Sequence, residues 1–93
     1  MADLADLPST LTTRERLILL IRQILGPPAA SRPLPIDARL NDLGLSSLKM
    51  VNLMLAIEVQ FHIAIPASDI TPDNFESITT VEALIFRLGG AQS

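Results

Sequence analysis

Hydrophobic residues along this chain recur at intervals of three and four, the spacing that places side chains on one face of an α-helix. The first run follows Thr12, which stands three residues before Glu15 as in a capping box. Its apolar positions are Leu17, Leu20, Ile21, Ile24 and Leu25. We predict a first helix that ends at the sequence Gly26-Pro27-Pro28. Its polar side chains are expected to point away from the apolar face: Arg14, Arg16, Arg22 and Gln23.

A proline-rich connection of about twenty residues follows, from Gly26 to Leu45. Loops of this length inside a small domain are unusual and often functional. Apolar residues are spaced along it: Leu34, Ile36, Leu40, Leu43 and Leu45. Because flexible linkers lack such anchors, we predict a structured crossover.

The second helix is predicted to begin at Ser46 or Ser47, since either hydroxyl can cap the free amides at a helix start. Gly44, in the turn before it, allows the backbone to expose the following side chains. The helix is apolar on most of its circumference, which is typical of a helix at the centre of a bundle or in contact with a partner or ligand. Pro66 prevents its continuation.

The chain after Pro66 is predicted to form an irregular or single-turn helical segment held by three apolar anchors, Ile70, Phe75 and Ile78. Thr79 and Glu82 have capping-box spacing and predict the start of a last short helix. The inner face of this helix is expected to comprise Val81, Leu84, Ile85 and Leu88. The pattern predicts one all-α domain over residues 12–88, between a flexible segment (1–11) and a tail (89–93).

The composition suits a small helical domain packed by aliphatic side chains, because the 93 residues are 48% hydrophobic with three Phe and no Trp or Tyr. The lack of cysteine excludes disulfides, thiolate metal sites and a cysteine nucleophile. No apolar run approaches the roughly 20 residues that span a bilayer, and the acidic N-terminus is unlike a secretory signal, so we expect a cytoplasmic protein. A net charge of −3 and scattered basic residues argue against nucleic acid as a partner.

The order of these elements resembles an acyl carrier protein. The segments that carry the resemblance are 42–48 (DLGLSSL), 58–61 (EVQF), 63–66 (IAIP) and 78–81 (ITTV). The resemblance implies a four-helix bundle with a long loop between helices 1 and 2 and a short third helix. It also implies a 4′-phosphopantetheine arm, whose thiol holds an acyl group as a thioester, on the serine directly before the leucine. In this chain that serine is Ser47, and a helix N-terminus independently favours an attached phosphate.

The resemblance implies several protein partners for an expected monomer: a phosphopantetheinyl transferase, an acyl- or aminoacyl-loading ligase, and downstream synthase or transferase enzymes. The residues expected to dock these partners are Leu48, Lys49, Met50, Asn52 and Met54. The residues expected to line a groove for the acyl group are Val51, Leu55, Ile57, Ile70, Phe75, Val81 and Leu84. The groove positions equally suit an ordinary core, so both interpretations stay open.

The sequence departs from the family at Ser46, where most members have aspartate. Since Leu48 follows Ser47, we expect Ser47 to carry the arm and Ser46 to cap the helix. Fatty-acid carriers present an acidic second helix, whereas Glu58 is the only acid here. The expected exposed positions are Lys49, Asn52, Val59, Gln60 and His62. We therefore predict a specialised, free-standing carrier that docks through apolar contacts, and not a housekeeping fatty-acid carrier. The identity of the cargo stays open, and a polyketide starter is among the possibilities.

Two alternatives remain. An aminoacyl carrier loaded by a dedicated ligase fits, because such carriers can have a Gly-Leu-Ser-Ser turn like residues 44–47. An unmodified helical interaction module also fits, with Ser47 as an ordinary cap residue. A hydrolase is excluded, since Ser47 and His62 would lie about 22 Å apart at opposite ends of one helix. No metal site is expected, because the loop aspartates lack the spacing of a calcium loop.

Overall fold

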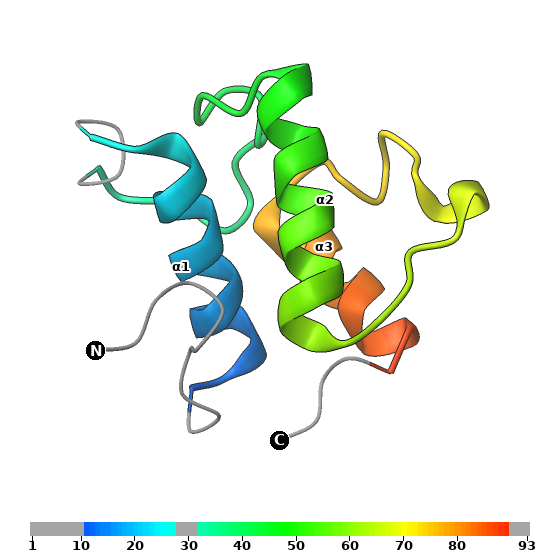
Figure 1. The fold of residues 1–93 in the computed structure, drawn as a ribbon. Coiled ribbons are helices and arrows are strands. Elements are labelled where there is room, and N and C mark those ends of the chain that lie inside the picture. The colour runs from blue at the N-terminus through cyan, green and yellow to red at the C-terminus, as the bar shows by residue number, and fades with distance from the viewer. Residues whose placement is uncertain (1–10, 28–31, 90–93) are drawn as a thin grey trace.

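The computed structural model describes residues 11–27 and 32–89. In these ranges the chain is all-α, as predicted, and α1 packs against both α2 and α3 around a shared core (Figure 1). The elements are α1 (Thr13–Leu25), α2 (Ser47–Phe61), the 3₁₀ turn η3 (Ala67–Asp69) and α3 (Ile78–Arg87). The predicted short third helix is thus a three-residue 3₁₀ turn between Pro66 and Pro72, where the chain has no room for a longer helix. Most of the predicted terminal segments, 1–10 and 90–93, lies outside the described residues.

The capping box predicted at the start of α1 is confirmed. The Thr12 hydroxyl accepts a hydrogen bond from the Glu15 amide at 3.1 Å, and the Thr12 amide donates to the Glu15 carboxylate at 2.9 Å. The helix ends at Gly26, whose φ of 69° lies in the left-handed region. Both ends of α1 are therefore set by local sequence.

The prediction that Arg16 points away from the domain is wrong. Its guanidinium lies 4.3 Å from the centroid of the Phe61 ring and donates to the Gln60 carbonyl at 2.7 Å. Arginine suits this position because its planar head can stack on an aromatic ring while it donates to a carbonyl at a helix end. Arg16 therefore joins α1 to the last turn of α2.

The segment that leads into α2 is attached to the first turn of α3 and to the residue Glu76 before that helix. Leu40 is fully buried, and its amide donates to the Glu76 carbonyl at 2.8 Å. The Thr79 amide donates to the Ile36 carbonyl at 3.0 Å, and its hydroxyl donates to the Asp37 carboxylate at 2.9 Å. These bonds hold the approach to α2 in one position.

The predicted cap of α3 at Thr79 is wrong by two residues. The helix is capped by Ser77, whose hydroxyl accepts from the Thr80 amide at 3.3 Å while its own amide donates to the Thr80 hydroxyl at 3.0 Å. Glu82, the expected partner of Thr79, forms an ion pair with Arg14 at 2.9 Å. With the cap at Ser77, Ile78 is the first residue of the helix, and its side chain is fully buried in the core. Burial of Ile78 therefore favours this earlier start.

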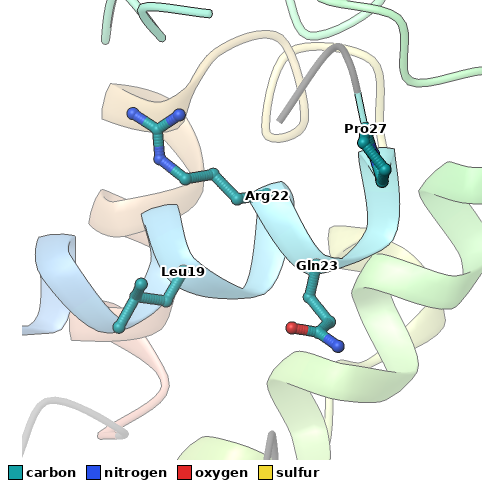
Figure 2. Close-up of a pocket in the computed structure, with 5 residues that line it drawn as sticks. Leu19, Arg22, Gln23 and Pro27 are labelled. Carbon is teal, nitrogen blue, oxygen red and sulfur yellow. The ribbon is translucent and has the colours of Figure 1, made fainter. Parts of the chain in front are cut away.

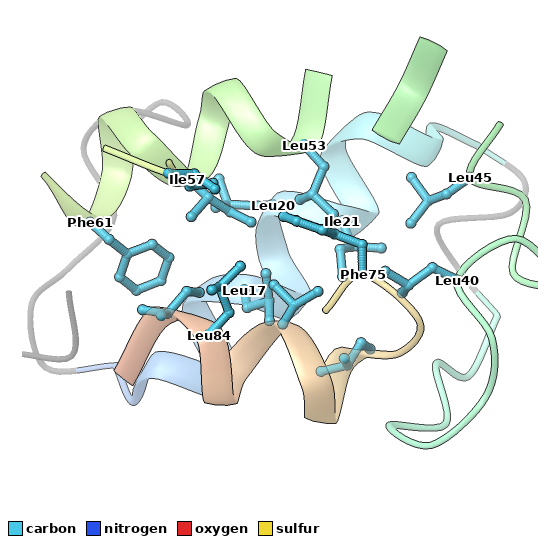
Figure 3. Close-up of a cluster of buried hydrophobic side chains, with 14 of the residues drawn as sticks. Leu17, Leu20, Ile21, Leu40, Leu45, Leu53, Ile57, Phe61, Phe75 and Leu84 are labelled. Atoms are coloured by element: carbon cyan, nitrogen blue, oxygen red, sulfur yellow. The ribbon is translucent and has the colours of Figure 1, made fainter. Parts of the chain in front are cut away.

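The core lies where α1, α2 and α3 meet, and the side chains converge on the space between them (Figure 3). Its fully buried large members include Leu17, Leu20, Ile21, Leu40, Leu45, Leu53, Ile57, Ile78, Leu84 and Ile85. Of the three anchors predicted after Pro66, Phe75 and Ile78 are buried, but Ile70 is 47% exposed because it directly follows η3, which contributes no buried residue. No helix among the described residues is long and apolar enough to cross a membrane.

Candidate attachment site at the start of α2

The two serines before Leu48 occupy different positions. Ser46 has extended backbone angles and is the N-cap of α2, with its hydroxyl accepting from the Lys49 amide at 3.4 Å. This is the role expected for Ser46. Ser47 is the first residue of the helix and is exposed. Its hydroxyl is thus the one left available for attachment.

The turn that presents Ser47 depends on Gly44. Its φ of 106° is a conformation that residues with side chains rarely adopt, and a Cβ there would lie 3.4 Å from a methyl carbon of Leu25. The Gly44 amide donates to the Asn41 carbonyl at 3.2 Å, and Leu45 is buried immediately after it. The chain changes direction at Gly44, and the buried side chain of Leu45 holds this turn against the core.

The first turn of α2 suits an attached phosphate. The first intrahelical backbone bond is made by the Met50 amide, which donates to the Ser46 carbonyl at 2.8 Å. Of the amides before it, that of Lys49 is capped by the Ser46 hydroxyl, and those of Ser47 and Leu48 have no carbonyl acceptor within the helix. Such amides, together with the helix dipole, favour a negative group at this end. The exposed hydroxyl and the helix N-terminus together fit the requirements of a phosphodiester-linked group.

The predicted docking residues differ in exposure. Leu48 and Asn52 are exposed on the outer face of α2. Lys49 is half-buried, and its ammonium donates to the Leu25 carbonyl at the end of α1 at 3.5 Å. Met50 and Met54 are partly buried against the core. Only part of this set therefore lies on an open surface.

The predicted groove residues do not line one groove in this structure. Ile57, Phe75, Val81 and Leu84 are buried in the core. Val51 and Leu55, with Ile70, are exposed instead. The helix turns Ile57 inward with Leu53 and Phe61, and turns Val51 and Leu55 outward.

Four exposed apolar residues form a stripe along α2 that the sequence pattern did not indicate as one surface. It consists of Leu48 (73% exposed), Val51 (50%), Leu55 (57%) and Val59 (64%). These residues are three or four positions apart, so they share one helix face. Gln60, expected on the surface, is buried beside the core because it follows the inward row of α2.

A hollow of 280 Å³ opens beside the first turns of α2. It is lined by Arg39, Asn41, Met50, Pro72, Asp73, Phe75 and Glu76. Met50 follows Ser47 by three positions and therefore lies on the same side of the helix. A second hollow, of 310 Å³, lies at the end of α1 and is lined by Leu19, Arg22, Gln23, Gly26 and Pro27 (Figure 2). It includes none of the predicted site residues.

Comparison with known protein families agrees with this geometry. Residues 15–87 match the family model described as "Phosphopantetheine attachment site". The chain belongs to this family. Its cofactor is 4′-phosphopantetheine, attached covalently, and the chain is a carrier protein that is not itself an enzyme.

Two curated relatives come from Bradyrhizobium diazoefficiens. Aminoacyl carrier protein 1 is 44% identical over 72 residues, which is 77% of this chain and 80% of the relative. Aminoacyl carrier protein 2 is 35% identical over 85 residues, which is 91% of this chain and 96% of the relative. Both alignments extend over most of each protein.

A solved structure shares the fold. It is the crystal structure of the Bradyrhizobium japonicum glycine:[carrier protein] ligase complexed with glycylated carrier protein. The similar chain is 45% identical, with a TM-score of 0.65, over 76% of this chain and 96% of that chain.

Proposed function

We propose that this chain is an aminoacyl carrier, which holds an aminoacyl group as a thioester on a 4′-phosphopantetheine arm attached to Ser47. The observation that supports the proposal is that the two serines occupy different positions at the start of α2. Ser46 is engaged as the helix cap, whereas Ser47 is exposed at the helix start and directly precedes Leu48. The arm, when attached, supplies the thiol to which the cargo is bound.

The residues of the chain itself present and fix the attachment point. Ser47 provides the hydroxyl, and the amides of Ser47 and Leu48 at the start of the helix favour the phosphate. Gly44 gives the turn its shape, and the buried Leu45 holds that turn on the core. A transferase therefore meets a hydroxyl in a fixed position.

The choice of an amino acid over a fatty acid or polyketide unit is supported by the relatives, which are named aminoacyl carrier proteins. It is also supported by the surface of α2. Glu58, its only acid, accepts a hydrogen bond from the Ile65 amide at 2.8 Å and so has a structural role. An acidic surface that would steer the helix to basic enzymes is therefore absent from α2.

The apolar stripe of α2 is the proposed contact surface for the loading ligase. Leu48 is next to Ser47, and Val51, Leu55 and Val59 extend the surface along the helix, with Asn52 beside it. Exposed leucine and valine on one helix face favour burial against a partner. Transferase and downstream enzymes that act on the same arm must approach the same end of α2.

The test of cargo is loading by a ligase. The chain carrying the arm is incubated with ATP, glycine and the Bradyrhizobium glycine:[carrier protein] ligase, and then with the other proteinogenic amino acids and ligases that activate them. We expect one amino acid to be added to the intact mass and to be released by hydroxylamine, as a thioester is. Acceptance of fatty-acyl groups from an acyl ligase, with no amino acid accepted, would contradict the aminoacyl assignment.

The docking surface is tested in the same assay with Leu55→Asp. Phe86→Asp is the matched control, because Phe86 is a comparably exposed apolar residue on α3. We expect Leu55→Asp to lower kcat/KM of loading about tenfold or more, as burial of an unpaired charge at a contact would. Equal effects of the two substitutions would place the contact elsewhere.

A further inference from the structure

We infer that Asp73 and Glu76 provide a docking position for the positively charged amino group of the cargo, in the hollow beside α2. The inference rests on the proposed function, since it requires an aminoacyl group on the arm at Ser47. It assigns to these residues a preference for amino acids over uncharged acyl groups.

The hollow has the two kinds of surface that such a cargo needs. Met50, Pro72 and Phe75 supply apolar lining, with the Phe75 ring also buried in the core. Asp73 and Glu76 supply carboxylates, and Asn41 an amide. Met50, which lines the hollow, is one helical turn from Ser47, so an arm attached at Ser47 begins one turn away from this lining residue.

The segment that carries the carboxylates is held in place. The Glu76 carbonyl accepts from the Leu40 amide at 2.8 Å, and the side-chain amide of Asn74 donates to the Asp69 carbonyl at 2.8 Å. Arg87 of α3 donates to Asn74 at 3.1 Å. The backbone on both sides of Asp73 is thus fixed, while Asp73 and Glu76 themselves are exposed.

The charges in the hollow match an amino acid bound through its carboxyl group. In an aminoacyl thioester the carboxyl carbon is part of the thioester, so the group has a free ammonium and no carboxylate. Asp73 and Glu76 complement the ammonium. Arg39, which also lines the hollow, can donate to the uncharged carbonyl oxygens of the thioester and the arm. Since exposed ion pairs are weak and screened by salt, we expect a preference of only a few fold.

The experiment compares two cargoes that differ only by the ammonium group. The arm is installed on ¹⁵N-labelled protein from coenzyme A analogues that carry either a glycyl or an acetyl group through a stable amide. Backbone amide shifts of Asn41, Met50, Phe75 and Glu76 are then recorded at low and high salt. We expect the glycyl group to shift these signals at least twofold more than the acetyl group, and the excess to disappear at high salt.

The variant with Asp73→Asn and Glu76→Gln should lose the excess, whereas Asp42→Asn should keep it. Asp42 is the matched control, because it is an exposed acid close to Ser47 that does not line the hollow. Thermal unfolding of each variant confirms that it is folded. Equal shifts from both cargoes in the unaltered protein would overturn the inference and leave the carrier function intact. Failure of the arm to attach at Ser47 would instead overturn the proposed function.

Discussion

The two ends of α2 are held in different ways. At the C-terminal end, Arg16 stacks on Phe61 and donates to the Gln60 carbonyl at 2.7 Å, and the Glu58 carboxylate accepts from the Ile65 amide at 2.8 Å. At the N-terminal end the hydrogen bonds that involve side chains are longer. The Lys49 amide donates to the Ser46 hydroxyl at 3.4 Å, and the Lys49 ammonium donates to the Leu25 carbonyl at 3.5 Å.

The C-terminal end of α2 therefore contributes more to the stability of the domain, whereas the N-terminal end presents Ser47 to other proteins. The distal end of the helix has the strong contacts, including a charge-assisted hydrogen bond to a carbonyl. The end that carries Ser47 and Leu48 is left open to solvent and is positioned by the turn at Gly44. A carrier can thus offer its serine to several enzymes without loosening its core.

The largest expected effect is that of Ser47→Ala, which should abolish attachment of the arm and leave the melting temperature nearly unchanged. The hydroxyl is exposed and caps nothing, so its removal affects chemistry alone. Intact mass after treatment with a transferase and coenzyme A, together with a thermal melt, measures both. A large fall in melting temperature would show that the Ser47 end of α2 also contributes to the stability of the domain.

Arg16→Ala should give the opposite pattern, with a loss of about 2 kcal/mol in the free energy of unfolding. It removes a hydrogen bond from a charged group and the stacking on Phe61, far from Ser47. Arg14→Ala is the control, because its exposed ion pair with Glu82 should contribute less than about 1 kcal/mol. Denaturant unfolding measures both variants. If both cost the same, Arg16 does not anchor α2.

Gly44→Val should cost about 1–3 kcal/mol through backbone strain and should also slow arm attachment. The second effect is expected because the turn places Ser47 and because the new side chain meets Leu25. Gly89→Val provides the control, since Gly89 also has a positive φ but no atom within 4 Å of the added Cβ. Attachment rates should fall for the first variant only. An unchanged rate in Gly44→Val would show that the turn does not position the serine.

Ser46→Ala should have the smallest effect, a loss at the low end of the roughly 0.5–2 kcal/mol typical of helix caps. Its hydrogen bond to the Lys49 amide is long, at 3.4 Å. Attachment of the arm should persist, as measured by intact mass. Loss of attachment here, with retention in Ser47→Ala, would exchange the roles of the two serines.

The features that the sequence predicted correctly are local ones. The cap at Thr12 and the cap role of Ser46 follow from residues within one helical turn. The start of α3 could not be chosen in this way, because Ser77 with Thr80 and Thr79 with Glu82 both have capping spacing. The burial of Ile78 and the distant ion pair between Arg14 and Glu82 decide between them.

The faces of α2 were equally beyond local inference. Val51, Leu55 and Ile57 are all aliphatic, so periodicity alone cannot select which of them face the core. The packing of α1 against α2 buries Ile57 and leaves Val51 and Leu55 outside. The position of Arg16 over Phe61 likewise depends on the pairing of two helices.

The proposed carrier function requires that Ser47 carries the arm. The most direct measurement is intact mass of the unaltered protein after reaction with a broad-specificity phosphopantetheinyl transferase and coenzyme A, followed by fragmentation to locate the added group. We expect a single phosphopantetheine on Ser47. Addition at Ser46, or no addition to the folded protein by any transferase tried, would contradict it.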